Sequence, residues 1–241
     1  MPTAARRSSP VVAIDGPSGA GKSSVSRGVA KALGYRYLDT GAMYRAVTWW
    51  MLRHDVDIHD AAQVAAHAAL PQIETGTNPA NPTITVDGLD VSGPIRGRDV
   101  TAAVSPVAAV PAVRARLVEI QRQAIGDGEI VVEGRDIGSV VVPDAELKVY
   151  LTAAPEARAA RRTAELSDPA IAADEVSLHT TLHTTKESLL HRDSIDSSRS
   201  TSPLTRAEGA VEVDSTDMSL NEVVEHVVAL FRSRVSAGAT S

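Results

Sequence analysis

The chain has 241 residues, of which 43% are hydrophobic and 22% are charged, as in soluble globular proteins, and its formal net charge is −6. The negative charge argues against a nucleic-acid polymer or an anionic membrane as the main partner, because it repels polyanions at long range. The absence of cysteine excludes disulfides, thiolate metal sites and thiol nucleophiles. No stretch approaches the roughly 20 apolar residues of a membrane span. No signal peptide precedes the first predicted strand, so we expect a cytoplasmic protein.

The first predicted elements surround a glycine-rich sequence. Residues 10–15 (PVVAID) are typical of a short buried strand, and residues 23–33 have the apolar spacing of a helix. Between them GPSGAGKS fits the pattern G-x-x-x-x-G-K-[ST], and this context predicts a P-loop that binds a nucleoside triphosphate. Lys22 would contact the β and γ phosphates, and Ser23 would be a magnesium ligand. The residues expected to bind the nucleotide are Gly16, Pro17, Ser18, Gly19, Ala20, Gly21, Lys22, Ser23 and Ser24.

The next segment predicts a parallel sheet with an insertion. A strand at residues 35–39 and a helix from Thr40 continue the alternation of strand and helix. Trp49 and Trp50 fall inside this helix, and we expect them to pack in the core. From residue 60 an alanine-rich helix precedes a Gly/Asn/Pro-rich stretch and a two-residue hairpin at Asp87-Gly88. We therefore expect a subdomain at residues 60–105 within a core of residues 10–59 and 106–235, with tails at 1–9 and 236–241.

The remaining elements complete a doubly wound α/β fold of about five parallel strands with helices on both faces. Strands are predicted at residues 129–133, 147–151 and 210–214, and helices at 111–125, 155–166 and 174–192. A polar run at residues 192–204 follows the last of these helices, and a capping box at Ser219 and Glu222 opens the final helix. His179 and His183 have the spacing of a metal pair, but they lack the Glu of H-E-x-x-H, so we expect them to face solvent.

A P-loop is shared by GTPases, motors, ATPases and small-molecule kinases. A signalling GTPase is disfavoured, because the only plausible D-x-x-G lies at residues 90–93 in the insertion and no N-K-x-D follows. Arg45 and Arg135 instead follow the carboxyl ends of predicted strands, where open α/β sheets bind ligands. Three further arginines share one helix face, either as a surface stripe or as part of a mobile lid at residues 155–173 that closes over a triphosphate. They are Arg158, Arg161 and Arg162.

Several motifs occur in order between residues 11 and 232. They are GPSGAGKS, LDTGAMYR (38–45), SPVAAVPAVR (105–114), EGRDIG (133–138) and R-D-x-x-D-x-x-R-x-x-x-P-L (192–204). Together they resemble the bacterial cytidylate kinases, P-loop enzymes of the nucleoside monophosphate kinase family. The resemblance implies magnesium-dependent transfer of the γ-phosphoryl group of ATP to CMP or dCMP, and it implies that the insertion binds the monophosphate.

The resemblance also implies roles for individual residues. Arg45 would bind the acceptor phosphate, Arg135 the phosphates, and Arg199 would lie between the two nucleotides. Cytosine would be read by Ser105, Arg114 and Asp136, and the sugar would be held by Arg192 and Asp196. The substrate-binding residues implied are Thr40, Tyr44, Arg45, Ser105, Arg114, Arg135, Asp136, Arg192, Asp196 and Arg199. The residues expected to act in catalysis are Lys22, Arg135, Arg158, Arg162 and Arg199.

Two positions depart from the pattern of many relatives. Glu133 replaces Asp, with an arm long enough to reach the water shell of the metal, and Thr40 replaces Ser but keeps the hydroxyl. The acceptor phosphate has a second pKa of about 6, so it is already mostly deprotonated at neutral pH and needs no general base. Alternatives are a P-loop kinase for another small acceptor, such as UMP or shikimate, and a non-catalytic nucleotide sensor. We expect small-molecule substrates only, no nucleic acid, no membrane, and a monomer.

Overall fold

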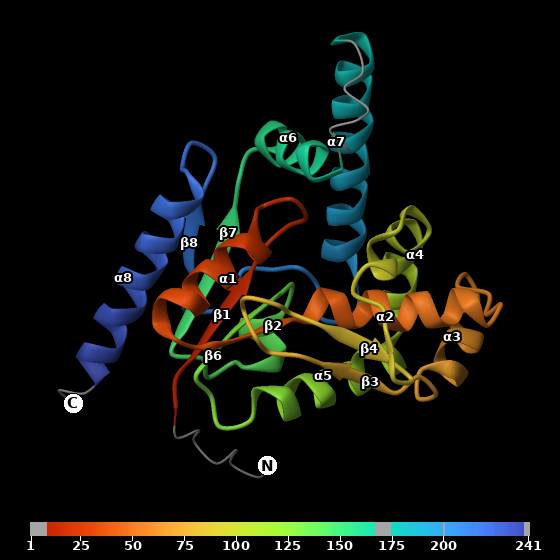
Figure 1. The fold of residues 1–241 in the computed structure, drawn as a ribbon, viewed down its shortest axis with the longest axis horizontal. Coiled ribbons are helices and arrows are strands. Elements are labelled where there is room, and N and C mark those ends of the chain that lie inside the picture. The colour runs from red at the N-terminus through yellow and green to blue at the C-terminus, as the bar shows by residue number, and fades with distance from the viewer. Residues whose placement is uncertain (1–8, 167–174, 200, 239–241) are drawn as a thin grey trace.

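The computed structural model describes residues 9–166, 175–199 and 201–238. Its central sheet has five strands in the order β2-β6-β1-β7-β8, and all neighbours pair in parallel (Figure 1). The strands are β1 (Val11–Asp15), β2 (Arg36–Asp39), β6 (Ile130–Gly134), β7 (Leu147–Thr152) and β8 (Val211–Asp214). The chain first runs to one side of β1 and later to the other, which places a topological switch point, the usual ligand site, at the carboxyl end of β1. The predicted doubly wound sheet is confirmed.

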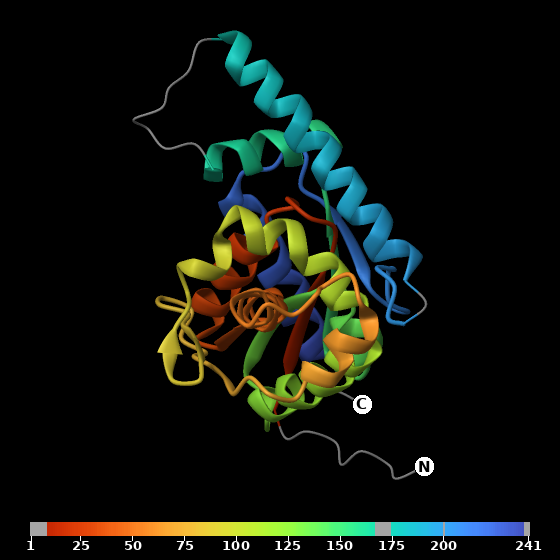
Figure 2. The ribbon, with the colours of Figure 1, turned by 90° about the vertical axis from the view of Figure 1, so that its right-hand side faces the viewer.

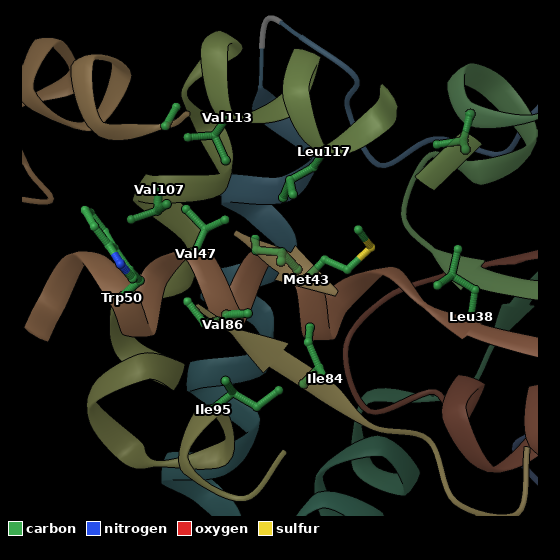
Figure 3. Close-up of a cluster of buried hydrophobic side chains, with 14 of the residues drawn as sticks. Leu38, Met43, Val47, Trp50, Ile84, Val86, Ile95, Val107, Val113 and Leu117 are labelled. Carbon is green, nitrogen blue, oxygen red and sulfur yellow. The ribbon is translucent and has the colours of Figure 1, made fainter. Parts of the chain in front are cut away.

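Side chains that alternate along β1 separate two hydrophobic cores. Val12 and Ile14 pack in the cluster beneath α1 (Lys22–Leu33) and α8 (Leu220–Gly238). Val11 and Ala13 face the opposite cluster, which α2 (Thr40–Arg53) and α5 (Pro111–Ile125) cover. Figure 3 shows the centre of that second cluster, with side chains of α2 between those of the insertion and those of the helices that follow it. Trp50 belongs to this cluster and the partly buried Trp49 packs against the cluster, so the prediction that both tryptophans pack in the core is confirmed.

The insertion contains its own small antiparallel sheet. Its strands are β3 (Ile73–Thr75), β4 (Ile84–Val86) and β5 (Leu89–Asp90). The predicted hairpin is confirmed: Val86 pairs with Leu89, and Asp87 and Gly88 both have positive φ, as a type I′ turn requires. The insertion also holds α3 (Ala61–His67), η1 (Pro94–Arg96) and α4 (Arg98–Ala109). Sequence analysis did not anticipate β3 or α4, and the expected boundary at residue 105 falls inside α4.

A strap from the insertion lies along the edge of the main sheet. The backbone N–H of Tyr37 in β2 donates to the carbonyl of Thr77 at 2.8 Å. The Nε of Arg27 in α1 donates to the carbonyl of Pro79 at 2.9 Å. The insertion is therefore fixed to both the sheet edge and the helix that follows the P-loop.

Two helices, α6 (Pro155–Leu166) and α7 (Glu175–Ser198), lie side by side at the end of the molecule where the strands terminate (Figures 1 and 2). The prediction that helix gives way to a polar run at residue 192 is wrong, because α7 continues to Ser198 and carries Arg192 and Asp196. Tertiary ion pairs of Asp193 with Arg158 and of Asp196 with Arg135 outweigh the weak helix propensity of Asp and Ser. Residues 167–173 of the predicted lid lie outside the described residues.

The C-terminal helix begins with the predicted capping box. The N–H of Ser219 donates to Glu222 Oε2 at 2.8 Å, and the N–H of Glu222 donates to Ser219 Oγ at 3.3 Å. Helix α8 continues to Gly238, three residues into the segment expected to be a tail. Among the described helices none is alone long and apolar enough to cross a membrane; α4 and α5 reach that threshold only when taken together, across a bend of 97°.

Candidate active site

The P-loop lies between β1 and α1, as predicted, and its glycines allow close approach of other segments. Gly19 has φ of +77°, and a Cβ there would lie 3.0 Å from the carbonyl oxygen of Arg158 in α6. Lys22 is buried, and its Nζ donates to the carbonyl of Pro17 at 2.8 Å. Burial, with Arg135 nearby, lowers the pKa of Lys22 to about 7. Bound phosphates would reverse this shift, because they stabilise the ammonium form.

A buried carboxylate stands beside the P-loop lysine. Glu133, near the end of β6, accepts hydrogen bonds from the hydroxyls of Tyr37 and Ser23. Burial and the neighbouring Asp39 raise the pKa of Glu133 to about 7. The parallel register places Asp39 opposite Glu133, so two carboxylates and the Ser23 hydroxyl meet at the wall of one cleft. Oxygen ligands of this kind suit a hard divalent cation.

Arg135 joins the P-loop to α7. Its Nη1 donates to the carbonyl of Gly16 at 3.1 Å, its Nη2 to Ser18 Oγ at 2.6 Å, and its Nε to Asp196 Oδ2 at 2.9 Å. Asp196 also pairs with Arg199, which follows the end of α7. The turn that carries Arg135 is held from below by Asp15, whose carboxylate accepts the N–H groups of Ile137 and Gly138, each at 2.8 Å.

The three arginines of α6 have different partners. Arg158 is buried, donates to the carbonyl of Ser18 at 2.9 Å and pairs with Asp193 of α7. Arg161 donates to the carbonyl of Ser215 at 2.6 Å in the loop after β8. Arg162 lines the main cleft. A solvated surface stripe is therefore wrong for Arg158, because only 7% of its side chain is exposed.

The opposite end of the cleft is built around a buried ion pair. Arg114 of α5 pairs with Asp136, donates to the carbonyl of Ala108 at 3.1 Å and lies 5.2 Å from the ring centroid of Tyr44. Ser105 of α4 is also buried and lines the same end of the cleft. Thr40, at the start of α2, donates to the carbonyl of Glu133 at 2.7 Å and so fixes the acceptor helix to β6.

Guanidinium groups crowd the middle of the cleft. Burial and the positive charges of Arg192 and Arg162 lower the pKa of Arg45 to about 10. Burial and Arg135 lower the pKa of Arg192 to about 10 as well, against the opposing effect of Asp196. Among the described residues, the buried Nε of Arg192 has no hydrogen-bond partner. An anion between these groups would relieve their repulsion and satisfy that donor.

These residues line one continuous cleft of about 580 Å³, large enough for small-molecule ligands. It runs from Lys22 and Ser23 past Arg135 and Arg192 to Arg45, Arg114 and Asp136, with Thr83 and Arg96 of the insertion on one wall. A second hollow of about 230 Å³ adjoins the other side of the P-loop. It is lined by Ala20, Gly21, Ser24, Val25, Arg161, Ser215, Met218, Leu220 and Val223.

Comparisons with known proteins show the family to which the chain belongs. The family model described as cytidylate kinase matches residues 12–233. The chain belongs to the cytidylate kinase family. A cytidylate kinase of Streptomyces avermitilis is 54% identical over 94% of both chains, and one of Mycolicibacterium paratuberculosis is 50% identical over 93% of this chain and 96% of the other. Among solved structures, a shikimate kinase from Acinetobacter baumannii has a TM-score of 0.45 at 13% identity and covers 94% of this chain and 95% of its own.

Four residues at or beside the cleft were assigned no role from the sequence. Tyr37 and Asp39 line it, Asp193 accepts from the N–H of Ser18 at its wall, and Asp15 lies near enough to Lys22 to affect the pKa of that lysine. The position of Asp15 and Asp39 at the carboxyl ends of parallel strands was a usable signal. Asp193 belongs to the R-D-x-x-D-x-x-R motif but was given no role, and Tyr37 carried no signal because its partner Glu133 is distant in sequence.

His183, one of the two histidines with metal-pair spacing, does not line the cleft. His183 is exposed and forms an ion-pair contact with Glu187 at 3.3 Å, as expected for a solvent-facing residue. The side chain of His179 lies outside the described residues. The described residues hold no group of three or more His, Cys, Asp or Glu that could bind a metal by itself.

Proposed function

We infer that this chain transfers the γ-phosphoryl group of ATP to CMP or dCMP and releases ADP with CDP or dCDP. Membership of the cytidylate kinase family supports this reaction. The structural observation that most directly supports the reaction is the group of buried arginines, Arg45 and Arg192, opposite the P-loop. A single triphosphate on Lys22 and Ser23 would leave Arg45 and Arg192 unmatched, whereas a second phosphate between them would neutralise both ends of the cleft.

The acceptor nucleotide is proposed to lie between Arg45 and the Arg114–Asp136 pair. Arg45 is held by the insertion through its bond to Thr101 Oγ1 at 2.9 Å, so the phosphate and the subdomain would be recognised together. Arg114 and Asp136 supply a donor and an acceptor at a buried position, as reading the edge of cytosine requires, with Ser105 beside them. Thr40 and Tyr44 would complete this pocket. Arg192 and Asp196 would hold the sugar.

The donor nucleotide is proposed to lie across the P-loop. Backbone N–H groups of residues 19–24, which include the start of α1, would bind its phosphates, and Lys22 would turn from Pro17 towards them. The hollow between Arg161 and Val223 lies where the adenine ring could extend from the loop. Arg135, Arg162 and Arg199 would surround the transferred group, where spread negative charge is stabilised by fixed cations. Arg158, which binds the carbonyl of Ser18 in the P-loop, would add positive charge next to the phosphates.

Magnesium fits the residues at the start of α1. Ser23 would be a direct ligand, and Glu133 and Asp39 would hold the water shell, because the carboxylates are held near the hydroxyl at one wall of the cleft. When bound, the cation would neutralise phosphate charge. The protein itself would align the two nucleotides and exclude water. It needs no general base, since the attacking phosphate oxygen is already deprotonated.

A coupled assay of ADP release across CMP, dCMP, UMP, AMP, GMP and shikimate tests this function. We expect the highest kcat/KM with the cytidine nucleotides and no turnover without magnesium. Faster turnover on UMP or shikimate would assign the chain to another acceptor. Binding of ATP and CMP without ADP release would favour a sensor. We further propose that the enzyme works in the cytoplasm, and that it works as a monomer because residues of one chain line both ends of the cleft.

A further inference from the structure

Ser18 lies in the middle of the P-loop, at a position that we call its crest. Its backbone and side-chain polar groups form hydrogen bonds with residues outside the loop. Its N–H donates to Asp193 Oδ1 of α7 at 3.0 Å. Its carbonyl accepts from Arg158 of α6 at 2.9 Å, and its hydroxyl accepts from Arg135 at 2.6 Å. All three polar groups of one loop residue are therefore bound by charged side chains from segments more than a hundred residues away.

Asp193 connects two of these contacts. One carboxylate oxygen accepts from the N–H of Ser18, and the other pairs with Nη1 of Arg158, so loop, α6 and α7 meet at a single side chain. Both partners of the ion pair are largely buried, with exposed side-chain fractions of 7% for Arg158 and 16% for Asp193. Bonds between charged groups shielded from water are stronger than exposed ones. Movement of α6 and α7 away from the loop must break these contacts together.

Close packing around the Asp193–Arg158 pair also indicates that α6 and α7 rest against the P-loop. A Cβ on Gly19 would lie 3.0 Å from the carbonyl oxygen of Arg158 and 3.3 Å from Leu189 Cδ1 of α7. Leu189 is buried, although the neighbouring Leu190 is exposed. The two helices therefore rest directly on the crest of the loop, and Asp193 supplies the charge that lets Arg158 be buried there.

We propose that Asp193 is a positioning residue of the ATP site. It docks α6 and α7 on the crest of the P-loop and holds Ser18 and Arg158 in the arrangement that receives the triphosphate. Without its carboxylate, the buried Arg158 would lose its ion-pair partner, and the N–H of Ser18 would lose its acceptor. The loop would then be less ordered before ATP binds, at a cost in ATP affinity. This inference rests on the proposed binding of ATP by the P-loop.

The test measures ATP affinity by calorimetry, KM for ATP and CMP, kcat and thermal unfolding. It uses Asp193→Ala, Asp193→Asn, Arg158→Ala and the double variant Asp193→Ala/Arg158→Ala. Glu187→Ala, which removes an exposed carboxylate from the same helix, is the matched control. We expect Asp193→Ala to weaken ATP binding about tenfold, the effect of one strong buried contact, and to change KM for CMP less. Asp193→Asn should lose less affinity, because its amide oxygen can still accept from Ser18.

The double variant should bind ATP no more weakly than the worse single variant, because the two residues act through one contact. ATP affinity within twofold of the parent in Asp193→Ala would overturn the proposal. An equal rise in both KM values, or additive losses in the double variant, would also overturn it and leave Asp193 as a residue that merely holds α7. A lower melting temperature alone cannot mimic the expected result, since KM does not depend on the folded fraction. Calorimetry with ATP decides the matter even if CMP is not the acceptor.

Discussion

The hydroxyl of Tyr37 donates a hydrogen bond to the carboxylate of Glu133, and both side chains are buried beside the P-loop. The parallel pairing of β2 with β6 creates this contact, because it places Tyr37 opposite Val131, two residues before Glu133 and on the same face of the sheet. The tyrosine holds Oε1 of a carboxylate that also accepts from the Ser23 hydroxyl.

Replacing Tyr37 with phenylalanine should therefore weaken magnesium binding without unfolding the core. Glu133 would lose its donor and occupy several rotamers, so we expect the magnesium concentration for half-maximal activity to rise several-fold. The magnesium-induced increase in melting temperature with ADP bound should shrink in parallel. Tyr35→Phe, which alters a ring packed at 5.8 Å from Phe231 at the other end of the strand, is the control. Equal magnesium titrations for the two variants would contradict the proposed role of Tyr37.

The P-loop lysine should be required for transfer but not for acceptor binding. Lys22→Met removes the ammonium that we place against the β and γ phosphates, and we expect kcat to fall by at least 10²–10³-fold, as when one preorganised charge is removed from a transition state. The dissociation constant of CMP should stay within about twofold. Lys31→Met changes an exposed lysine of the same helix and should have no effect. Near-normal turnover of Lys22→Met would refute the P-loop role.

The buried pair of Arg114 and Asp136 should set the preference for cytosine over uracil. Arg114→Ala or Asp136→Ala leaves the partner charge and one base contact unsatisfied. We therefore expect the free energy of discrimination between CMP and UMP, calculated from the ratio of their kcat/KM values, to fall by about 1–3 kcal/mol. Arg116→Ala is the matched control, because that side chain bonds the carbonyls of Ala68 and Pro71 at 2.9 and 2.7 Å, away from the cleft. An unchanged ratio in the first two variants would place base recognition elsewhere.

The stability of the fold should respond to the titration of Asp15. Burial raises the pKa of this carboxyl from 3.8 to about 6, so the folded state binds the proton more tightly than the unfolded chain. The free energy of unfolding should then fall as the pH rises from about 4 to about 6, by up to about 3 kcal/mol. Asp15→Asn should flatten this part of the profile in urea unfolding at several pH values. Asp214→Asn, at the exposed end of β8, should leave the slope in place. An unaltered slope in Asp15→Asn would assign the titration to another group.

Much of the fold followed from local patterns. The strand, loop and helix around GPSGAGKS, the Asp87-Gly88 turn and the Ser219–Glu222 capping box depend on residues within a few positions of one another, so short stretches of sequence determine them. The parallel direction of the strands followed from the alternation of strand and helix, whereas their order β2-β6-β1-β7-β8 came only from the structure. The extension of α7 to Ser198 did not, because its last turn is stabilised by Arg135 of another segment.

By itself the sequence determined the chemistry of this protein: a P-loop, an inserted subdomain and an unusual supply of arginine at strand ends. Only the tertiary structure decided which of those arginines share a cleft and which are neutralised. Arg158, Arg161 and Arg162 share one face of α6, yet their surroundings differ. Arg158 binds Ser18 of the P-loop, Arg161 binds Ser215 after β8, and Arg162 lines the cleft. These different environments depend on carboxylate and carbonyl groups from segments that are distant in sequence and that the fold brings close to α6. The energies of such charges depend on distance and burial, which local sequence does not encode.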